Sequence, residues 1–336
     1  MNSRLTKCLG HSYTLMSLRS KRNKSTVIDG KLVFENVLKD LRQEISAFVA
    51  SGNKPPSLTA LTAGYDPSSL SYVKIKRKAA QSVGVDCNIV ELRSSYTDDD
   101  VLRIISQLNK DDRVDGILVQ LPLFPHNNER IICDAVAHRK DVDGTSAASL
   151  GNLCLNTDHF IPCTALAVHH ILKNVIGLDY CGKRAVVIGR SKHVGLPIAI
   201  LLHSSEQYGD IEGLNMTTTI AHRHTPRNTL IELSSSADVL VSAAGVPGLV
   251  TADMVKPGAI VLDVGVTKTV TPEGKSVFRG DVNFADVQNK VMYITSVPGG
   301  IGPVTVAMLM RNVFKSARIR EAKLRSEEAI ETNQNQ

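Results

Sequence analysis

Tryptophan is absent from this chain of 336 residues, and aromatic residues make up only 4% of it. No aromatic RNA-binding motif occurs and no basic stripe follows the first residues, so the sequence gives no support for nucleic-acid binding. No apolar run is long enough to span a membrane or to form the core of a secretory signal. The remainder, 43% hydrophobic and 21% charged, is the composition of a globular protein with room for two domains.

Cysteine is also scarce, and its six residues are scattered along the chain. No CxxC pair occurs, so the spacing indicates neither a zinc site nor a disulfide framework. A reducing compartment such as the mitochondrial matrix is compatible with this pattern. The six residues are Cys8, Cys87, Cys133, Cys154, Cys163 and Cys181.

Acidic residues are missing from the amino-terminal segment, where the first is Asp29. Residues 1–26 instead hold six basic residues and five serines. Bases and hydroxyls without acids are typical of a mitochondrial transit peptide. The alternative is a disordered basic tail. Only composition separates the two interpretations. The first interpretation predicts a location in the mitochondrial matrix.

Beyond this segment, apolar strands alternate with amphipathic helices, which predicts α/β domains with parallel sheets. Apolar residues keep helical spacing over residues 31–50, and a second, Rossmann-like run of strands and helices begins near residue 165. A Gly/Pro loop near residue 297 leads into a last helix and a polar tail that we expect to fray. The strands of the first run are expected at 57–64, 87–92 and 115–123.

The helix after the first of these strands turns one lysine toward its apolar face. At 100° per residue, Lys76 shares that face with apolar residues, and Tyr72 lies one turn before it. Partial desolvation lowers the pKa of a lysine, and a neutral amine can act as a base or proton shuttle. The alternative is a snorkelling lysine on a half-buried face. The face holds Ser69, Tyr72, Val73, Lys76, Ala79, Ala80 and Val83, whereas Lys74, Arg77 and Lys78 point elsewhere.

The segment "VVIGRSKHVGLP" is a candidate phosphate loop between a strand and a helix. Gly189 permits a tight turn at the strand end, and Gly195 lets the helix pack closely. The helix N-terminus would offer free N–H groups to a pyrophosphate. The generic GxGxxG fingerprint is not met, so an ordinary loop between strand and helix is the alternative.

The next strand ends in bases where a Rossmann site for NAD usually carries an acid for the ribose hydroxyl. Its end reads "AHRHTPR", with His222, Arg223, His224 and Arg227. A guanidinium such as that of Arg223 is suited to bind a phosphate through two hydrogen bonds. A solvated basic loop is the alternative.

The order of these features separates two families. A YxxxK pair also occurs in short-chain dehydrogenases, but there it follows the glycine-rich loop, whereas Tyr72 precedes it here. The chain instead resembles the methylenetetrahydrofolate dehydrogenase/cyclohydrolases over about residues 29 to 318, and its leader, "ASGNKPP" and "AHRHTP" are most similar to the mitochondrial animal type. The motifs are, in order, "SYVKIKRKAA", "VDGILVQLPL", "DVDG", "VVIGRSKHVGLP", "ADVLVSAAG", "IVLDVGV", "GDVNF" and "VPGGIGPVTVAML".

This resemblance implies two α/β domains around a cleft, the second a Rossmann-like dinucleotide-binding domain, in a homodimer. After the transit peptide of residues 1–26, the folate-binding catalytic domain would take residues 27–150 and 298–325. The NAD(P)-binding domain would take residues 151–297, and residues 326–336 would form a flexible tail. Tetrahydrofolate derivatives would be the partners, with no nucleic acid and no membrane.

The resemblance also implies a reaction. The enzyme would oxidise 5,10-methylenetetrahydrofolate to the methenyl form by hydride transfer to NAD or NADP, and then hydrolyse it to 10-formyltetrahydrofolate. The hydride step mainly requires alignment of the two carbons. The hydrolysis requires proton transfers, which Lys76 supplies if it is neutral.

Individual roles follow motif by motif from the resemblance. Lys76 is the catalytic lysine, Tyr72 packs against the folate, and Gln120 polarises and positions Lys76. Asp143 in "DVDG" binds the pterin, although a turn acid alone usually indicates only turn chemistry. Further substrate contacts are expected from Val119, Leu121, Pro298, Gly299, Gly300, Ile301, Gly302 and Pro303, and cofactor contacts from Gly189, Arg190, Ser191, Arg223 and Val266.

Some positions depart from the family pattern. The mitochondrial type binds Mg²⁺ and phosphate beside the cofactor through two aspartates, where this chain has Asn156 and Asn215. Neutral amides are poorer ligands for a hard cation, although Asp158 offers a replacement for one of them. We therefore expect both NAD and NADP to be used. Departures that remove no catalytic group are Thr145, Ala165 and Ser296.

Two other classes of function stay open at this point. One is a dehydrogenase that has lost the cyclohydrolase activity, against which the retained Tyr72, Lys76 and Gln120 argue. The other is a non-catalytic dinucleotide-binding or RNA-binding protein, against which the retained groups and the lack of a basic stripe argue.

Overall fold

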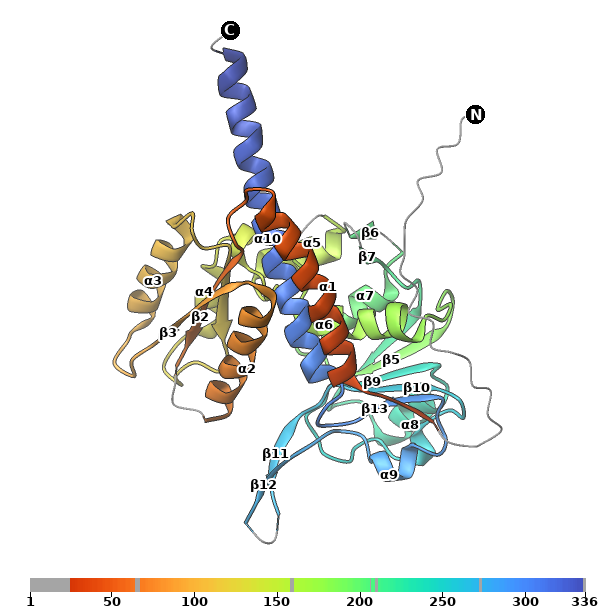
Figure 1. The fold of residues 1–336 in the computed structure, drawn as a ribbon. Helices are drawn as coiled ribbons and strands as arrows, with labels where there is room; N and C mark the ends of the chain where they lie inside the picture. Colours follow the sequence, from red (N-terminus) through yellow and green to blue (C-terminus); the bar gives the residue numbers. More distant parts are fainter. Residues whose placement is uncertain are drawn as a thin grey trace, which may run out of the picture.

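Strands and helices alternate along the chain in the computed structural model, and they form two α/β domains, each with its own parallel sheet (Figure 1). The predicted fold class is therefore confirmed.

The structure describes residues 25–63, 67–157, 160–205, 207–208, 211–271 and 274–334. In chain order the elements are β1 (Thr26–Ile28), α1 (Gly30–Ala50), β2 (Ser57–Thr62), α2 (Pro67–Val83), β3 (Asp86–Glu91), α3 (Asp98–Lys110), β4 (Gly116–Gln120), α4 (Glu129–Asp134), η1 (His138–Lys140), α5 (Ala147–Leu155), α6 (Cys163–His170), the π-helix η2 (Ile171–Ile176), β5 (Arg184–Ile188), α7 (Gly195–His203), β6 (Gln207–Tyr208), β7 (Ile211–Glu212), β8 (Thr217–Ala221), α8 (Arg227–Ser235), β9 (Val239–Ser242), η3 (Ala252–Met254), β10 (Ile260–Asp263), β11 (Thr267–Val270), β12 (Ser276–Arg279), α9 (Phe284–Val287), β13 (Tyr293–Thr295) and α10 (Ile301–Gln334).

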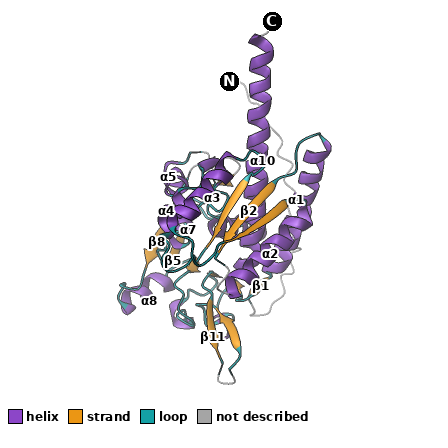
Figure 2. Ribbon diagram, turned by 90° about the vertical axis from the view of Figure 1, so that its left-hand side faces the viewer, coloured by secondary structure: helices purple, strands orange, loops and turns teal. Residues whose placement is uncertain are grey.

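The first sheet has three parallel strands in the order β3-β2-β4. Successive side chains of a strand point to opposite faces, and both faces of this sheet are covered. On β4, Leu118 packs into the core shared with α1 and α2, whereas Ile117 and Val119 pack into the core shared with α3. Figure 2 shows helices on both sides of these strands. This double coverage explains why the strand reads as a continuous apolar run.

The second sheet has six parallel strands in the order β1-β13-β10-β9-β5-β8. From β5 the chain first adds β8 on one side and then returns to add β9 on the other. The direction of winding therefore reverses between β5 and β9. In open α/β sheets, ligands bind at the carboxyl ends of the strands that flank such a switch point.

The long helices α1 and α10 lie side by side between the two domains (Figure 1). Leu41 and Ile45 of α1 and Val304 and Leu309 of α10 belong to one buried apolar cluster. That cluster also contains Val187 of β5 and residues of the first sheet. The two domains thus share a continuous hydrophobic core.

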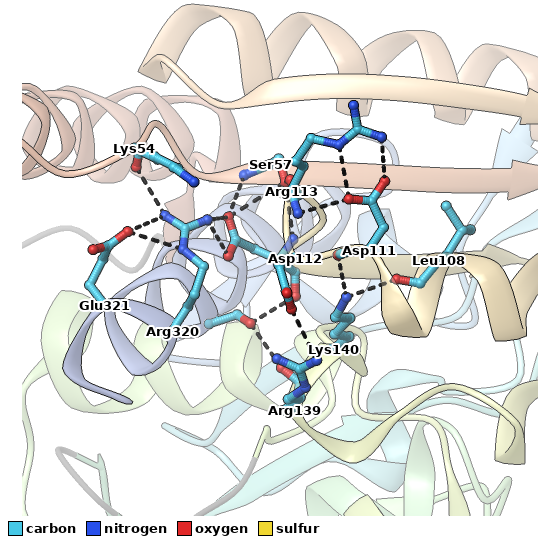
Figure 3. Close-up of polar contacts among 12 residues, drawn as sticks. Lys54, Ser57, Leu108, Asp111, Asp112, Arg113, Arg139, Lys140, Arg320 and Glu321 are labelled. Carbon is cyan, nitrogen blue, oxygen red and sulfur yellow. Dashed lines mark hydrogen bonds and ion pairs between the residues drawn. The ribbon is translucent and has the colours of Figure 1, made fainter. Parts of the chain in front are cut away.

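Polar contacts fasten α10 to the amino ends of β2 and β4 (Figure 3). Arg320 donates to both carboxylate oxygens of Asp115, each at 2.7 Å, and the two side chains are only 11% and 1% exposed. The same carboxylate accepts from the Ser57 N–H at 2.9 Å. Nearby, the Lys140 ammonium donates to the carbonyls of Leu108 (2.8 Å) and Asp111 (2.7 Å), and burial lowers the pKa of that lysine.

Two ends of the described chain differ from the expected domain division. Residues 26–28 pair with β13 and so extend the second sheet, although the division placed residue 27 in the first domain. Three residues are too few to show a period, so the sequence gives no sign of this strand. At the other end, α10 continues to Gln334 where a frayed tail was expected, with good helix formers and a Lys323–Glu327 ion pair at 3.4 Å.

In the part of the chain that the structure covers, no helix is both long and apolar enough to cross a membrane. The segment interpreted as a transit peptide lies almost entirely outside the described residues, which begin at residue 25.

Candidate active site

Helix α2 presents Lys76 to the interior as its spacing predicts. Val73 is buried on the same face, and Lys74 on the other side of the helix is exposed. Lys76 itself is half-buried, and Tyr72, one turn earlier, keeps 38% of its surface exposed. The predicted orientation of Lys76 is therefore confirmed.

A glutamine at the end of β4 holds this lysine. The Lys76 Nζ donates to Gln120 Oε1 at 2.8 Å, although the two residues are 44 positions apart in sequence. Gln120 Nε2 donates to the carbonyl of Leu121 at 2.9 Å, which turns the amide oxygen toward the lysine. Because the acceptor is a neutral amide, Lys76 is not paired with a carboxylate at this contact. Its amine can still form further hydrogen bonds. Val119, the preceding residue, is buried in the sheet.

The two acids of "DVDG" have different surroundings. Asp141 is buried and accepts from the N–H groups of Thr145 (3.2 Å) and Ser146 (2.9 Å), so it fixes the turn. Asp143 is half-buried instead. Gly144, which follows Asp143, has φ +67°, and a Cβ on it would lie 2.7 Å from the Pro162 nitrogen. The turn therefore requires glycine, and it frees Asp143 from holding the backbone.

The charges of Asp143 and Lys76 both act on the buried thiol of Cys163. Burial raises the pKa of this thiol well above its ordinary value; the nearby Asp143 carboxylate raises it further, and Lys76 lowers it. Cys163 Sγ donates to the carbonyl of Val142, the residue before Asp143, at 3.4 Å. The structure thus joins Lys76 to Gln120 by a hydrogen bond, and the charges of Lys76 and Asp143 both reach Cys163. Cys163 was not identified from the sequence, because an isolated cysteine has no distinctive spacing.

Asn312 is a second residue that the sequence interpretation missed. It lies in α10, is 5% exposed, and its Nδ2 donates to the carbonyls of Val142 (2.8 Å) and Ile161 (3.1 Å). It therefore ties the turn that bears Asp143 to the segment before Cys163. An asparagine inside an apolar helical stretch is the signal that would have indicated it.

Of the expected Pro298–Pro303 loop, residues 298–300 lie between β13 and α10, against the start of α1, whereas residues 301–303 already form the first turn of α10. Gly299 has φ +101°, and a Cβ on Gly30 would lie 1.8 Å from the Gly300 carbonyl oxygen. Ser296 donates to the carbonyl of Pro298 at 3.1 Å, so this departure from the family pattern supports the loop. Ile301, the first residue of α10, is buried.

The candidate phosphate loop lies at the switch point of the second sheet. Gly189 has φ +127°, and a Cβ on it would lie 2.2 Å from the Ala243 carbonyl oxygen. A Cβ on Gly195 would lie 2.2 Å from the Gly189 carbonyl oxygen. The predicted reasons for both glycines are therefore confirmed.

The predicted free N–H groups at the start of α7 are wrong in detail. Ser191 Oγ accepts from the N–H groups of Val194 (3.1 Å) and Gly195 (3.4 Å), and the Ser191 carbonyl accepts from Leu196 (3.0 Å). Serine caps a helix in this way because its short side chain reaches the first orphan donors. Arg190 and Ser191 are exposed, so the loop itself, rather than these three N–H groups, faces a ligand.

Arg190 and Arg223 end neighbouring strands in register. Ile188 of β5 pairs with Ala221 of β8, and each is followed two residues later by an arginine. Both side chains are exposed, and Arg223 forms no hydrogen bond or ion pair with another described residue. The turn that carries Arg223 is closed by the His222 N–H, which donates to Thr225 Oγ1 at 3.0 Å.

Two buried aspartates support the same edge, and sequence analysis did not single them out. Asp281 accepts from Ser242 Oγ (2.9 Å) and from the N–H groups of Ala244 (2.7 Å) and Val246 (2.8 Å), which orders the loop after β9. Asp263, at the end of β10, accepts from the Asp281 N–H at 3.0 Å. Burial raises the pKa of Asp263 to about 7. Beyond β10, the predicted cofactor contact Val266 is 46% exposed.

Asn156 and Asn215 lie on either side of Ser204. Ser204 Oγ donates to Asn156 Oδ1 at 3.5 Å, and the Asn215 N–H donates to the Ser204 carbonyl at 3.0 Å. They are the two non-glycine residues with positive φ among those described, at 55° and 53°. Asparagine is among the residues that tolerate this left-handed conformation best. No group of three His, Cys, Asp or Glu side chains that could hold a metal occurs among the described residues, and Asp158 lies outside them.

Family models match both domains. The catalytic domain of tetrahydrofolate dehydrogenase/cyclohydrolase matches residues 28–143, and the NAD(P)-binding domain of that family matches residues 162–321. The bifunctional methylenetetrahydrofolate dehydrogenase/cyclohydrolase, mitochondrial, of Gallus gallus is 44% identical over 304 residues, with 90% of each chain covered. The Homo sapiens protein named bifunctional methylenetetrahydrofolate dehydrogenase/cyclohydrolase 2, mitochondrial, is 42% identical over 298 residues, covering 88% of this chain and 85% of its own.

Solved structures agree with this assignment. The 5,10-methylenetetrahydrofolate dehydrogenase of the silkworm Bombyx mori superposes with a TM-score of 0.82 at 42% identity, over 89% of this chain and 99% of that one. The Trypanosoma brucei dehydrogenase-cyclohydrolase, complexed with NADP cofactor and inhibitor, gives a TM-score of 0.81 at 35% identity, over 88% and 98%. With models matched across both domains and relatives of this similarity, the chain belongs to the tetrahydrofolate dehydrogenase/cyclohydrolase family.

Proposed function

We propose that this protein oxidises 5,10-methylenetetrahydrofolate to 5,10-methenyltetrahydrofolate by hydride transfer to NAD⁺ or NADP⁺ and then hydrolyses the product to 10-formyltetrahydrofolate. The observation that carries the proposal is the hydrogen bond of 2.8 Å between Lys76 and Gln120. The family models that match both domains, together with this retained contact, argue against a binding protein without catalysis.

The chemistry assigns a separate task to each side chain. Oxidation leaves a cation that both folate nitrogens stabilise, so the protein mainly has to align the reacting carbons. Addition of water and opening of the ring need proton transfers, and we assign these to Lys76. Gln120 holds the lysine amine in place, Asp143 and Tyr72 hold the folate, and the loop from Pro298 to Pro303 borders the substrate.

Cofactor binding follows from the second sheet. Gly189, Ser191 and Val266 would contact the dinucleotide at the switch point. Because β5 and β8 are paired in register, Arg190 and Arg223 both follow the carboxyl ends of these neighbouring strands. Two guanidiniums there suit a phosphate, either the covalent phosphate of NADP or inorganic phosphate beside NAD.

Asn156 and Asn215 do not lie with these arginines, because Asn215 precedes β8 and Arg223 follows it, at the opposite end of the strand. Asn156 and Asn215 offer neutral amide oxygens, and both have left-handed backbones that asparagine accommodates. Mg²⁺ prefers carboxylate ligands and an octahedral arrangement. The left-handed backbone at Asn156 and Asn215 therefore accounts for an asparagine at each position without a bound metal. Without Mg²⁺ we do not expect a strict preference for NAD.

Three further features of the molecule belong to the proposal. The folate-binding domain comprises residues 29–150 and 298–325, and the NAD(P)-binding domain comprises residues 151–297 together with strand β1. The protein works as a homodimer in the mitochondrial matrix, which the names of its mitochondrial relatives support for the location. Sedimentation of the purified protein at several concentrations tests the dimer, and a purely monomeric species contradicts it.

A spectrophotometric assay tests the activity directly. Purified protein is supplied with methylenetetrahydrofolate and either NAD⁺ or NADP⁺, and both the reduced cofactor and 10-formyltetrahydrofolate are followed. We expect both products with both cofactors. Reduced cofactor with accumulation of the methenyl compound at its uncatalysed rate of hydrolysis identifies a dehydrogenase without cyclohydrolase activity.

A further inference from the structure

A groove of about 740 Å³ runs between α1 and α10, on the outer side of the shared core. Its volume lies within the range of small-molecule sites in proteins. Apolar side chains form much of its surface, among them Phe48, Leu166, Met308, Phe314 and Ile319. Phe48 and Phe314 meet edge to face, with ring centroids 5.4 Å apart. The groove can therefore hold an apolar or aromatic body.

Basic side chains line the α10 wall of this groove at regular spacing. Arg311, Arg318 and Arg325 occur every seven residues, so they repeat every two turns, roughly 10 Å apart along one side of the helix. Lys315 adds a fourth base. Against these four bases the groove contains two acids, Glu44 and Glu321.

Both acids already have an arginine partner. Glu44 lies 3.6 Å from Arg311, and Glu321 lies 2.8 Å from Arg320. Arg325 donates to Asn53 Oδ1 at 2.9 Å. Arg318, in the middle of the stripe, is exposed and forms no hydrogen bond or ion pair with another described residue. The excess of positive charge is therefore centred on Arg318, next to Ile319 and one turn from Phe314.

We propose that the groove between α1 and α10 is a second ligand site, which binds an amphipathic anion through Arg318 and through the apolar surface around Phe48 and Phe314. The class is a carboxylate or sulfonate with an aliphatic or aromatic body. A guanidinium binds such a head group through charge-assisted hydrogen bonds, and the apolar surface removes the body from water.

The floor of the groove connects it to the folate site. Asn312 lines the groove and also donates to the carbonyls of Val142 and Ile161. Val142 immediately precedes Asp143. A ligand that presses on Asn312 shifts the turn that carries Asp143, so binding in the groove weakens binding of the folate. This consequence rests on the proposed function, whereas binding in the groove does not.

The test uses the full chain with saturating NAD⁺, so that the dinucleotide site is filled. The probe is 8-anilinonaphthalene-1-sulfonate, whose fluorescence rises in apolar surroundings, and dodecanoate is the competitor. Arg318→Gln removes the charge, and Ala322→Trp fills the groove, since Ala322 lines it and is exposed. Lys323→Gln and Lys323→Trp are matched controls on the same helix, because Lys323 is exposed and does not line the groove. Thermal unfolding establishes that all four variants fold.

We expect wild type and both Lys323 variants to bind the probe and to release it to dodecanoate. Arg318→Gln should bind about tenfold more weakly, and Ala322→Trp should lose binding. Equal binding in all five proteins overturns the site. Dodecanoate should also raise the KM for methylenetetrahydrofolate in wild type but not in Ala322→Trp. An unchanged KM in wild type, while the probe is displaced, overturns the connection to the folate site.

Discussion

Lys74 and Lys76 lie two positions apart on α2, yet only Lys76 is turned toward the interior of the domain. Lys74 is exposed, whereas Lys76 is half-buried and donates to Gln120. Lys76→Met keeps much of the volume of the side chain but cannot take or give a proton. We expect cyclohydrolase turnover to fall by about 10²- to 10⁴-fold, with cofactor binding and folding intact.

Lys74→Met is the matched control for this variant, because it removes the same charge from the same helix. Formation of 10-formyltetrahydrofolate is measured for both. A Lys76→Met protein that turns over at the wild-type rate, like the control, contradicts the assignment of Lys76.

Arg223 is the residue that decides how phosphate enters cofactor choice. Its side chain is exposed next to the end of β8, in register with Arg190. Arg223→Ser removes charge-assisted hydrogen bonds worth about 1.5–3 kcal/mol, so turnover with NAD at a given phosphate concentration should fall accordingly. In wild type, turnover with NAD should rise with added phosphate and less steeply with Mg²⁺.

The measurement is kcat/KM for NAD and NADP across phosphate and Mg²⁺ titrations, in wild type and in Arg223→Ser. Arg227→Ser, four residues later at the start of α8, controls for general loss of charge. If the rate with NAD responds neither to phosphate nor to the mutation, Arg223 is a solvated surface base.

At the scale of elements, the carboxyl end of β10 makes stability depend on pH. Burial raises the pKa of Asp263 to about 7 in the folded protein, against about 4 in an unfolded chain. The folded state therefore binds the proton more tightly, and the stabilisation present at low pH is lost as pH rises from about 4 through about 7. Urea unfolding should show this decline in wild type.

Asp263→Asn imitates the protonated form at every pH, so its decline over that interval should be smaller. Asp253→Asn is the control, since that carboxylate is exposed. Parallel pH profiles of the unfolding free energy for wild type and Asp263→Asn count against a protonated Asp263.

The attachment of α10 to the first sheet is the second feature at this scale. Arg320→Met leaves Asp115, which is 1% exposed, without its guanidinium. Removal of one partner from a buried ion pair costs about 3–5 kcal/mol, because the remaining charge is buried alone. Arg103→Met, in an exposed pair with Asp100, should cost less than about 1 kcal/mol. Denaturant unfolding compares them, and equal losses contradict the role assigned to Arg320.

At the scale of the whole molecule, import should depend on the basic amino-terminal segment. Residues 1–26 hold six bases, five serines and no acid. Fused to a fluorescent protein, this segment should direct it to mitochondria, and a fusion with the six bases changed to glutamine should stay in the cytosol. A cytosolic signal from the unchanged segment rejects the transit peptide.

Much of the architecture and part of the site follow from local rules that a single stretch of sequence contains. The helical period places Lys76 on the inner face of α2, and alternation of strands with helices implies parallel sheets. Thr97 and Asp100 form a capping box at the start of α3, with the Thr97 N–H 2.9 Å from the carboxylate, and such a cap depends only on residues three apart. The need for glycine at positions 189 and 195 could also be predicted, because each lies at a tight position of a short loop between strand and helix. The residue roles came from motif order, which local physics alone does not supply.

Other features depend on contacts between distant segments and have no local signature. β1 pairs with β13, and Asn312 reaches Val142 across 170 positions. Ser191 takes the N–H groups that a simple strand-turn-helix pattern leaves free. A hydrogen bond or a buried charge is decided by which groups the fold brings within about 3 Å, and periodicity carries no information about that distance. Secondary structure and facing direction are therefore local properties of this chain, whereas the surroundings of each functional side chain arise only when segments that are distant in sequence pack together.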